Sequence, residues 1–217
     1  MNLWQHVQKH DFSSPENQIK LLVKEAKKLI GKKKIKILDI GGSFRDRKEM
    51  LFDLGSISTL DIEPGPGIDL VGDAHKLPLT DNSFDLVALF MVLEHLEEPG
   101  VALKEIARVL KPQGLLLLTT VQYWHNHPCP KDYYRYTRTG LEYLCEKSGL
   151  KVKIIWSQGG PSLVIFHAIE LNLPVFWRKI FLLAAPIFNK FNRPENSNDS
   201  LGWSLIATRF VTKKDDA

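Results

Sequence analysis

The chain has 217 residues, of which 44% are hydrophobic and 25% are charged, and its formal net charge is +4. This length and composition are those of an ordinary globular protein with one hydrophobic core, so we expect a single domain over residues 1–217. The basic residues are scattered rather than gathered in a block, which argues against a nucleic-acid-binding protein. The two cysteines, Cys129 and Cys145, suggest neither a disulfide framework nor a four-ligand zinc site.

The sequence is typical of a protein that stays in the cytoplasm. Its first residues, MNLWQHVQKHDFSSPENQ, lack the charged start, the unbroken apolar stretch and the small-residue cleavage site of an export signal. A membrane-spanning helix needs roughly 18 uncharged apolar residues. Glu170, Arg178 and Lys179 interrupt the most apolar region of the chain. We therefore expect a cytoplasmic protein without a membrane span.

Short apolar strands alternate with helices along most of the chain. The predicted helices start with one that runs from Ser14 to Gly31, followed by KEMLFDLG ending at Gly55, residues 101–110 and a helix around Leu141, Leu144 and Cys145. The predicted strands are residues 35–40, 57–62, 68–71 and 84–90, the run LLLLTTV after Gly114, and residues 152–156 and 204–211. This alternation predicts an α/β fold with a parallel sheet that helices cover on both faces.

One apolar segment departs from this alternation. Residues 161–191 are rich in aromatic residues and are cut by Pro174 and Pro186, so we expect two or three short helices. These helices could complete the core, form a lid over an apolar acceptor, or present a membrane-surface or dimer patch. The polar residues 193–200 that follow are expected to form a mobile connection to the last strand.

Residues with useful chemistry follow four of the predicted strands. In an open parallel sheet, ligands bind beyond the carboxyl ends of the strands. At these ends the sequence has Asp39, Gly41, Gly42 and Ser43, then Asp61 and Glu63, then Gly72 and Asp73, and finally Glu94 and His95. The pattern G-x-G-x-x-G of a dinucleotide site fails here, because Ser43 and Asp46 stand where its second and third glycines belong. The ligand is therefore expected to lack a pyrophosphate, which disfavours a nicotinamide-dependent reductase.

S-adenosylmethionine fits these groups. Its ribose hydroxyls can donate to Asp61, its adenine amine can donate to an acid such as Asp73, and its methionine end needs the close backbone approach that the glycine turn allows. The alternative for each residue taken singly is a structural turn or cap. The joint spacing of the two acids and the glycine turn favours the nucleoside site.

Several stretches resemble the class I S-adenosylmethionine-dependent methyltransferases. They are LDIGGS, TLDIEPGPGIDLVGDAHKLPLTDNSFDLV, VLEHLEEPGVALKEIARVLKPQGLLLLTT and HPCPKDYYRYTRTGLEYLCEKSGL, and the resemblance covers residues 35–150. It implies a Rossmann-like sheet of seven strands whose last strand is antiparallel, here with a helical insertion before that strand. It also implies a cofactor site formed by Asp39, Gly41, Gly42, Ser43, Asp61, Ile62, Asp73, Ala74, Phe90 and His95. Ser43 and Arg45 replace two glycines of the first motif of the family.

The loop after the fifth strand is expected to lie over the methyl-donor end of the cleft. His127, His125 and Asp132 are the candidate bases, and Tyr133, Tyr134 and Arg135 are the candidate acceptor-binding residues. The stretch HNHPC at residues 125–129 resembles metal-ligand spacing, but Pro128 stiffens it and no fourth donor is evident nearby. We therefore predict no metal site from the sequence.

These observations predict a methyltransferase that uses S-adenosyl-L-methionine. Its acceptor is expected to be a small molecule or a lipid-linked molecule, with no nucleic acid involved and with possible membrane or dimer contact through residues 161–191. The alternative is a protein that binds S-adenosylmethionine without transferring its methyl group.

Overall fold

The structure is a computed structural model that describes residues 15–31, 33–42, 45–184, 187–188, 191 and 198–210. The predicted start of the first helix at Ser14, the candidate Ser43 and residues 193–197 of the predicted mobile connection lie outside the described residues.

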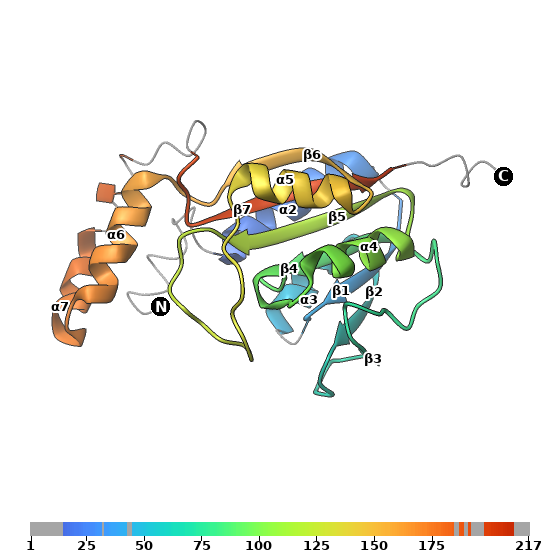
Figure 1. Ribbon diagram of the computed structural model, residues 1–217, viewed down its shortest axis with the longest axis horizontal. Helices are drawn as coiled ribbons and strands as arrows, with labels where there is room; N and C mark the ends of the chain where they lie inside the picture. The colour runs from blue at the N-terminus through green and yellow to red at the C-terminus, as the bar shows by residue number, and fades with distance from the viewer. Residues whose placement is uncertain are drawn as a thin grey trace.

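A seven-stranded sheet forms the centre of the molecule, in the order β3-β2-β1-β4-β5-β7-β6 (Figure 1). β1 pairs in parallel with β2 and β4, β2 with β3 and β4 with β5, whereas β7 is antiparallel to both β5 and β6. The predicted mostly parallel sheet with an antiparallel last strand is therefore confirmed. The strands are β1 (Ile35–Ile40), β2 (Gly55–Asp61), β3 (Leu70–Val71), β4 (Phe84–Phe90), β5 (Leu110–Val121), β6 (Leu150–Ser157) and β7 (Gly202–Arg209).

Helices cover both faces of this sheet. The helices are α2 (Pro15–Ile30), α3 (Arg45–Phe52), α4 (Pro99–Val109), α5 (Arg138–Lys147), α6 (Pro161–Asn172) and α7 (Val175–Phe181), with short 3₁₀ turns η1 (Leu93–His95) and η2 (Leu182–Ala184). Buried residues of α2 and α3 join one hydrophobic cluster, and those of α4 and α5 join another. The sheet lies between these two clusters.

Alternation along the strands explains the two clusters. Leu86, Ala88 and Phe90 of β4 pack in the cluster that contains α2, whereas Val87 and Leu89 pack in the cluster that contains α4. Successive side chains of a strand point to opposite faces, so an apolar run such as FDLVALF is buried on both sides. The last five residues of β4 are fully buried. The observed strand has the predicted bounds, residues 84–90.

The segment before β7 extends from one end of the sheet as α6, α7 and η2 (Figure 1). The predicted short helices between residues 161 and 191 are thus present. Rings of Phe166, Phe181 and Phe188 pack together, with centroids 4.7 Å apart for Phe166 and Phe181. Of the described side chains of α6, Leu163 and Phe166 are buried.

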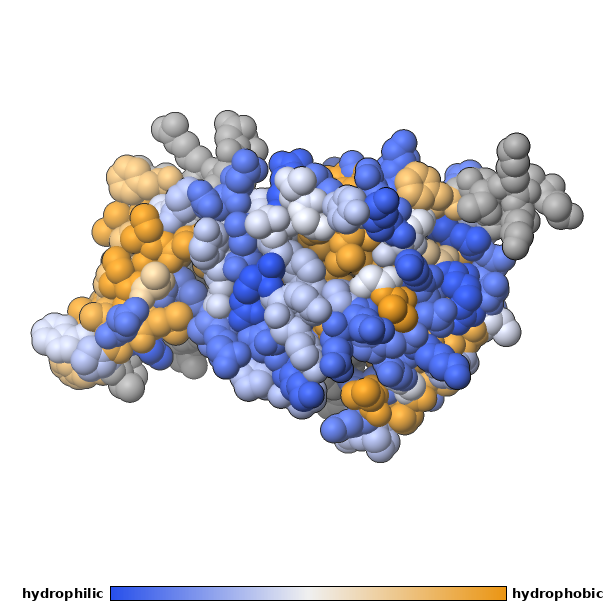
Figure 2. Space-filling view, in the orientation of Figure 1, coloured by the Kyte–Doolittle hydropathy of each residue, from blue (hydrophilic) through white to orange (hydrophobic). Residues whose placement is uncertain are grey.

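Many other apolar side chains of this segment are exposed, and Figure 2 shows a hydrophobic surface over α6 and α7. They are Ile165, Ile169, Leu171, Phe176, Trp177, Ile180, Leu183, Ile187 and Phe191. Among the described residues, no helix is both long and apolar enough to cross a membrane.

Candidate functional site

The carboxyl ends of the central strands lie at one edge of the sheet. The backbone N–H of Gly41 donates to the carbonyl of Leu60 at 2.8 Å, and that of Gly72 donates to the backbone carbonyl of Asp61 at 2.9 Å. The N–H of Met91 likewise donates to the carbonyl of Thr119 at 2.9 Å. These bonds continue the strand pairing to the last residues of the strands, so the loops after β1, β2, β3 and β4 leave the sheet together.

The turn after β1 requires its two glycines. Gly41 has φ +71°, and a Cβ atom on it would lie 2.5 Å from Cγ2 of Val92. A Cβ atom on Gly42 would lie 2.7 Å from Oδ2 of Asp39. Asp39 has no exposed surface, so its carboxylate lies directly beneath the turn. The turn is therefore a backbone surface that a ligand can approach closely.

Asp61 ends β2 at the same edge. Its side chain is half-buried, and its Oδ1 accepts a hydrogen bond from the backbone N–H of Glu63 at 3.3 Å. The next residue, Ile62, is 64% exposed. The Asp61 side chain is thus partly accessible to a ligand beyond the strand ends.

Asp73 follows β3 and is held by His75. Oδ1 of Asp73 accepts from the backbone N–H of His75 at 2.8 Å and lies 2.6 Å from its Nδ1. Because Nε2 of His75 accepts from the N–H of Glu98, the ring proton is on Nδ1. The pKa of Asp73 lies below its ordinary value, chiefly because of the backbone hydrogen bond from His75. The carboxylate is therefore ionised at neutral pH and half exposed, while Ala74 beside it is buried.

Two other residues that the resemblance implied for the cofactor site lie after or at the end of β4. Phe90 has no exposed surface and packs in the α2 cluster. A cofactor contact at Phe90 therefore requires a shift of this strand end and stays a prediction. His95 is half-buried in η1, and its Nδ1 lies 2.7 Å from the carbonyl oxygen of Lys131 in the loop after β5.

The loop after β5 is fixed by an ion pair between the buried Asp132 carboxylate and the more exposed Arg135. The two carboxylate oxygens of Asp132 lie 2.5 and 2.6 Å from the guanidinium nitrogens of Arg135, and the side chain of Asp132 is only 2% exposed. The Arg135 guanidinium holds the pKa of Asp132 far below its usual range. Asp132 and Arg135 are thus bound to each other, which makes Asp132 a poor base.

His127 lies between Asp132 and Glu94. Its Nδ1 is 3.0 Å from the carbonyl oxygen of His125 and 3.3 Å from Oδ2 of Asp132. Its Nε2 is buried and lies 3.9 Å from Oε1 of Glu94. The predicted base candidates His127 and Asp132 are therefore together, but His125 instead lies 3.5 Å from Nε2 of His167 in α6.

Glu94, which the sequence places after the fourth strand but which is not among the predicted site residues, is central to this arrangement. Glu94 has no exposed surface, and its Oε2 accepts a hydrogen bond from the hydroxyl of Thr120 at 2.8 Å. Burial raises the pKa of its carboxyl group. Its carbonyl oxygen accepts from the N–H groups of Tyr133 and Tyr134 at 2.9 and 3.2 Å. Glu94 thus anchors the candidate acceptor loop to η1.

The candidate acceptor residues have mixed surroundings. Tyr133 and Tyr134 are 38% and 39% exposed, so both rings are open to a ligand. The Tyr134 hydroxyl already donates to the carbonyl of Glu97 at 2.9 Å. Their assignment to an acceptor site remains a prediction.

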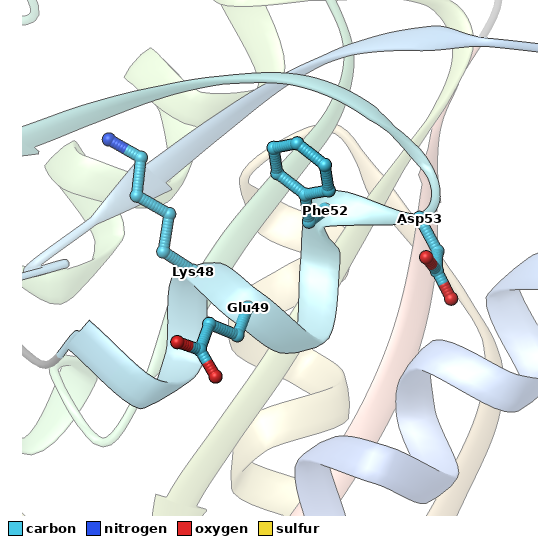
Figure 3. Close-up of a pocket in the computed structure, with 4 residues that line it drawn as sticks. All are labelled: Lys48, Glu49, Phe52 and Asp53. Atoms are coloured by element: carbon cyan, nitrogen blue, oxygen red, sulfur yellow. The ribbon is translucent and has the colours of Figure 1, made fainter.

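A separate hollow of about 350 Å³ lies along α3, where Lys48, Glu49, Phe52 and Asp53 line it (Figure 3). None of the predicted site residues lines it. Lys48 pairs with Asp69 at 3.3 Å and Asp53 with Lys27 at 3.0 Å. Both ion pairs lie at the surface, and we assign no ligand to the hollow.

Comparison with known sequences supports the resemblance. Residues 53–118 match the model of a methyltransferase domain. A demethylmenaquinone methyltransferase of Renibacterium salmoninarum is 32% identical over 124 residues, which are 52% of this chain and 52% of that protein. One of Staphylococcus aureus is 41% identical over 73 residues, which are 33% of this chain and 29% of that protein. The chain thus spans about half or less of the length of these curated relatives.

Solved structures share the fold. A Burkholderia thailandensis 1,6-didemethyltoxoflavin-N1-methyltransferase with bound S-adenosylhomocysteine has a TM-score of 0.59 at 15% identity, covering 90% of this chain and 80% of that one. A Mesorhizobium loti S-adenosylmethionine-dependent methyltransferase has a TM-score of 0.56 at 16% identity, covering 85% and 96%. The [4+2]-cyclase SpnF has a TM-score of 0.58 at 18% identity, covering 89% and 81%. At these identities the likeness concerns the fold alone.

Proposed function

We propose that this chain, which belongs to the class I S-adenosylmethionine-dependent methyltransferases, binds S-adenosylmethionine beyond the ends of β1, β2 and β3 and transfers its methyl group to a small acceptor. One observation carries the proposal: Asp61, Asp73 and the glycine turn after β1 meet at one edge of the sheet. This is the edge at which open α/β sheets bind ligands.

Each group would recognise one part of the cofactor. The partly accessible Asp61 side chain would accept hydrogen bonds from the two ribose hydroxyls. The ionised Asp73, whose two contacts with His75 both use Oδ1, would accept from the adenine amine. The turn at Gly41 and Gly42 would let the methionine part approach the backbone.

The acceptor would enter beside the loop after β5. In the reaction, an electron pair of the acceptor forms a bond to the methyl carbon while the carbon–sulfur bond breaks and its electrons pass to sulfur, which leaves S-adenosylhomocysteine. Positioning and exclusion of water supply much of the rate of such an in-line displacement. If the acceptor is a hydroxyl or an ammonium group, its proton must leave. His127 is the best supported base, since Arg135 occupies Asp132 and His125 lies against α6.

The acceptor class is proposed from two further observations. Two of the matched relatives are demethylmenaquinone methyltransferases, so demethylmenaquinone in its reduced, quinol form is the first acceptor to test. The exposed apolar side chains of α6 and α7 suit a lipid-linked acceptor met at a membrane surface.

Calorimetric titration with S-adenosylhomocysteine tests the cofactor site. Removing a hydrogen-bonded charge costs roughly 1.5–3 kcal/mol. We therefore expect Asp61→Ala to weaken binding by about 10- to 100-fold. Asp53→Ala is the matched control, because this exposed aspartate lines the α3 hollow and should leave the affinity unchanged. Equal affinities of the wild type and Asp61→Ala would contradict the proposed site.

Turnover separates methyl transfer from the alternative of cofactor binding alone. The protein is incubated with S-adenosylmethionine carrying a labelled methyl group and a panel of quinone, sugar, phenol and lipid-extract acceptors. Methylated product supports the transferase. Cofactor binding without product across the panel favours the alternative, and the fold alone does not decide between them, because a [4+2]-cyclase shares it.

A further inference from the structure

We propose that Glu94, His95 and His127 bind a divalent transition-metal ion such as Zn²⁺. One carboxylate oxygen of Glu94 and one ring nitrogen of each histidine lie within 4.8 Å of one another. The three residues come from two segments, since Glu94 and His95 lie in η1 after β4 and His127 lies in the loop after β5. Two imidazoles and a glutamate are a ligand set that proteins use for zinc.

Glu94 is the first reason to expect a cation. The residue is completely buried, and Oε1 has no hydrogen-bond partner among the described residues, while Oε2 is bound to Thr120. An unpaired buried carboxylate oxygen is destabilising unless a positive charge or a donor faces it. A cation between Glu94 and the two histidines would satisfy this oxygen.

The histidines are the second reason, because their ring protons are fixed. Nδ1 of His95 faces the carbonyl of Lys131 at 2.7 Å, and Nδ1 of His127 faces the carbonyl of His125 at 3.0 Å. A carbonyl oxygen accepts and never donates, so Nδ1 of each neutral ring carries the proton and Nε2 carries the lone pair. Nε2 of His127 is buried and has no hydrogen-bond partner within the described part of the chain.

The hydrogen bonds at Nδ1 of His95 and His127 match those of metal-binding histidines. In metal sites, the ring nitrogen that does not touch the metal donates to a carbonyl or a carboxylate, which orients the ring. His127 has both, because Oδ2 of Asp132 also lies 3.3 Å from its Nδ1. Asp132 is in turn held by Arg135, so both the His125 carbonyl and a fixed carboxylate orient the His127 ring.

The distances suit a small cation after a modest contraction. Zinc lies about 2.0–2.2 Å from its ligands, which puts two ligands of a tetrahedral site about 3.4 Å apart. Nε2 of His127 and Oε1 of Glu94 are 3.9 Å apart. Nitrogen ligands favour Zn²⁺ or Co²⁺ over Mg²⁺ and Ca²⁺, which prefer oxygen. Three protein ligands leave one position open.

The role of this cation in catalysis rests on the proposed function, whereas its binding does not. An acceptor oxygen that takes the open position would lose its proton to water at neutral pH, because a bound cation lowers the pKa of its hydroxyl group. The oxygen lone pair could then attack the methyl carbon. His127 would act as a ligand here, so the cation would replace the imidazole as the activating group.

Metal titration of the metal-free 217-residue chain tests the site directly. We expect one Zn²⁺ per chain by calorimetry, a visible absorption band on addition of one Co²⁺, and no binding of Mg²⁺ at the same concentrations. Glu94→Gln and His127→Ala should each lower Zn²⁺ affinity at least about 100-fold, since each removes one of three ligands. Glu94→Gln keeps an oxygen that can accept from Thr120.

Two matched controls separate this site from surface binding. His125→Ala removes a neighbouring imidazole but keeps the carbonyl that holds His127, and Cys129→Ser removes the exposed thiol of the same loop. Both should retain the wild-type Zn²⁺ affinity. Absence of stoichiometric Zn²⁺ binding, or an equal loss in His125→Ala and His127→Ala, would overturn the site. If Glu94→Gln does not fold by circular dichroism, His127→Ala decides the question.

Titration with S-adenosylhomocysteine on the same samples keeps the two proposals distinguishable. Zn²⁺ binding without cofactor binding would retain the metal site and reject the methyltransferase. Cofactor binding with no Zn²⁺ binding would do the reverse.

Discussion

Gly41 and Gly31 have nearly the same φ angle but different surroundings. Their φ angles are +71° and +73°, yet a Cβ atom would lie 2.5 Å from Val92 at Gly41 and would meet nothing within 4 Å at Gly31. The left-handed conformation alone costs an alanine roughly 1–2 kcal/mol. We expect Gly31→Ala to lower the free energy of unfolding by about that amount, and Gly41→Ala to lower it by about 1–3 kcal/mol more because of the clash.

Urea denaturation of the two variants measures this difference, and cofactor titration adds a second reading. Gly31 ends α2, away from the strand ends, so Gly31→Ala should keep the cofactor affinity. Gly41→Ala should weaken it by displacing the turn. Equal destabilisation by both substitutions would mean that Val92 moves aside freely and that the turn does not depend on close packing.

The residues of the candidate site differ in how far the sequence predicts them. Asp61 ends β2 and Asp73 follows β3 after Gly72, so the apolar pattern of the two strands is enough to locate both residues. The pairing of Glu94 with His127 depends on the path of the loop after β5, which Asp132 and Arg135 fix in three dimensions. The two histidines of HNHPC are a weak sequence signal for a metal site, but the other two ligands of the proposed site, Glu94 and His95, lie about thirty residues earlier in the chain.

At the scale of elements, apolar runs predict the strands and misjudge some of their ends. The segment KPQG at residues 111–114 is typical of a turn, yet β5 begins at Leu110. Gln113 adopts φ +63° and the pairing with β4 shifts register between Phe84 and Leu86, so the strand continues through an irregularity. Similarly, β2 begins at Gly55, where a Cβ atom would clash with the carbonyl of Ile35. Such long-range contacts are invisible to local periodicity.

The exposed apolar surface of α6 and α7 predicts binding to membranes. Phe176 and Trp177 are 68% and 57% exposed, so a membrane surface could cover them. We expect the protein to sediment with vesicles of phosphatidylcholine and phosphatidylglycerol. Phe176→Asp should lower the bound fraction at least about fivefold, since burying an aromatic side chain contributes on the order of 1–3 kcal/mol. Tyr143→Asp, on the exposed side of α5, is the matched control.

Retention of all wild-type protein in the supernatant would contradict membrane contact. Size-exclusion chromatography tests the alternative that this surface forms a dimer contact. A dimer that Phe176→Asp dissociates would show that two copies of the chain cover the apolar side chains, and the lipid hypothesis would then be wrong.

At the scale of the whole molecule, buried and paired charges link stability to pH. The carboxylates of Asp69, Asp85, Glu105 and Asp132 have pKa values below their ordinary ones because of hydrogen bonds and neighbouring cations. Burial lowers the pKa of His167 and raises that of Glu94. Wherever the unfolded chain binds more protons than the folded one, stability falls as the pH falls. The four carboxylates and His167, whose pKa values are lowered, all make stability fall as the pH falls. The raised pKa of Glu94 makes stability fall as the pH rises.

Among these carboxylates, Asp132 should contribute most to the loss of stability at low pH, because its side chain is 2% exposed and bound to Arg135. Its folded pKa lies below the ordinary 3.8, so its contribution is complete above about pH 5 and is lost as the pH falls through the folded value. At pH 7, Asp132→Asn should lower the free energy of unfolding by about 2 kcal/mol. The variant should also lose less stability than the wild type between pH 6 and pH 3.

Urea unfolding at a series of pH values tests this, with Glu16→Gln as control because its pair with Lys20 is exposed and should contribute little. Parallel pH curves for the wild type and Asp132→Asn would contradict the role of the ion pair. The same curves bear on the site, because Asp132 also orients His127. If Asp132→Asn weakens Zn²⁺ binding about 10- to 100-fold while the folded fraction stays constant, the ion pair orients the metal ligand and does not merely stabilise the loop.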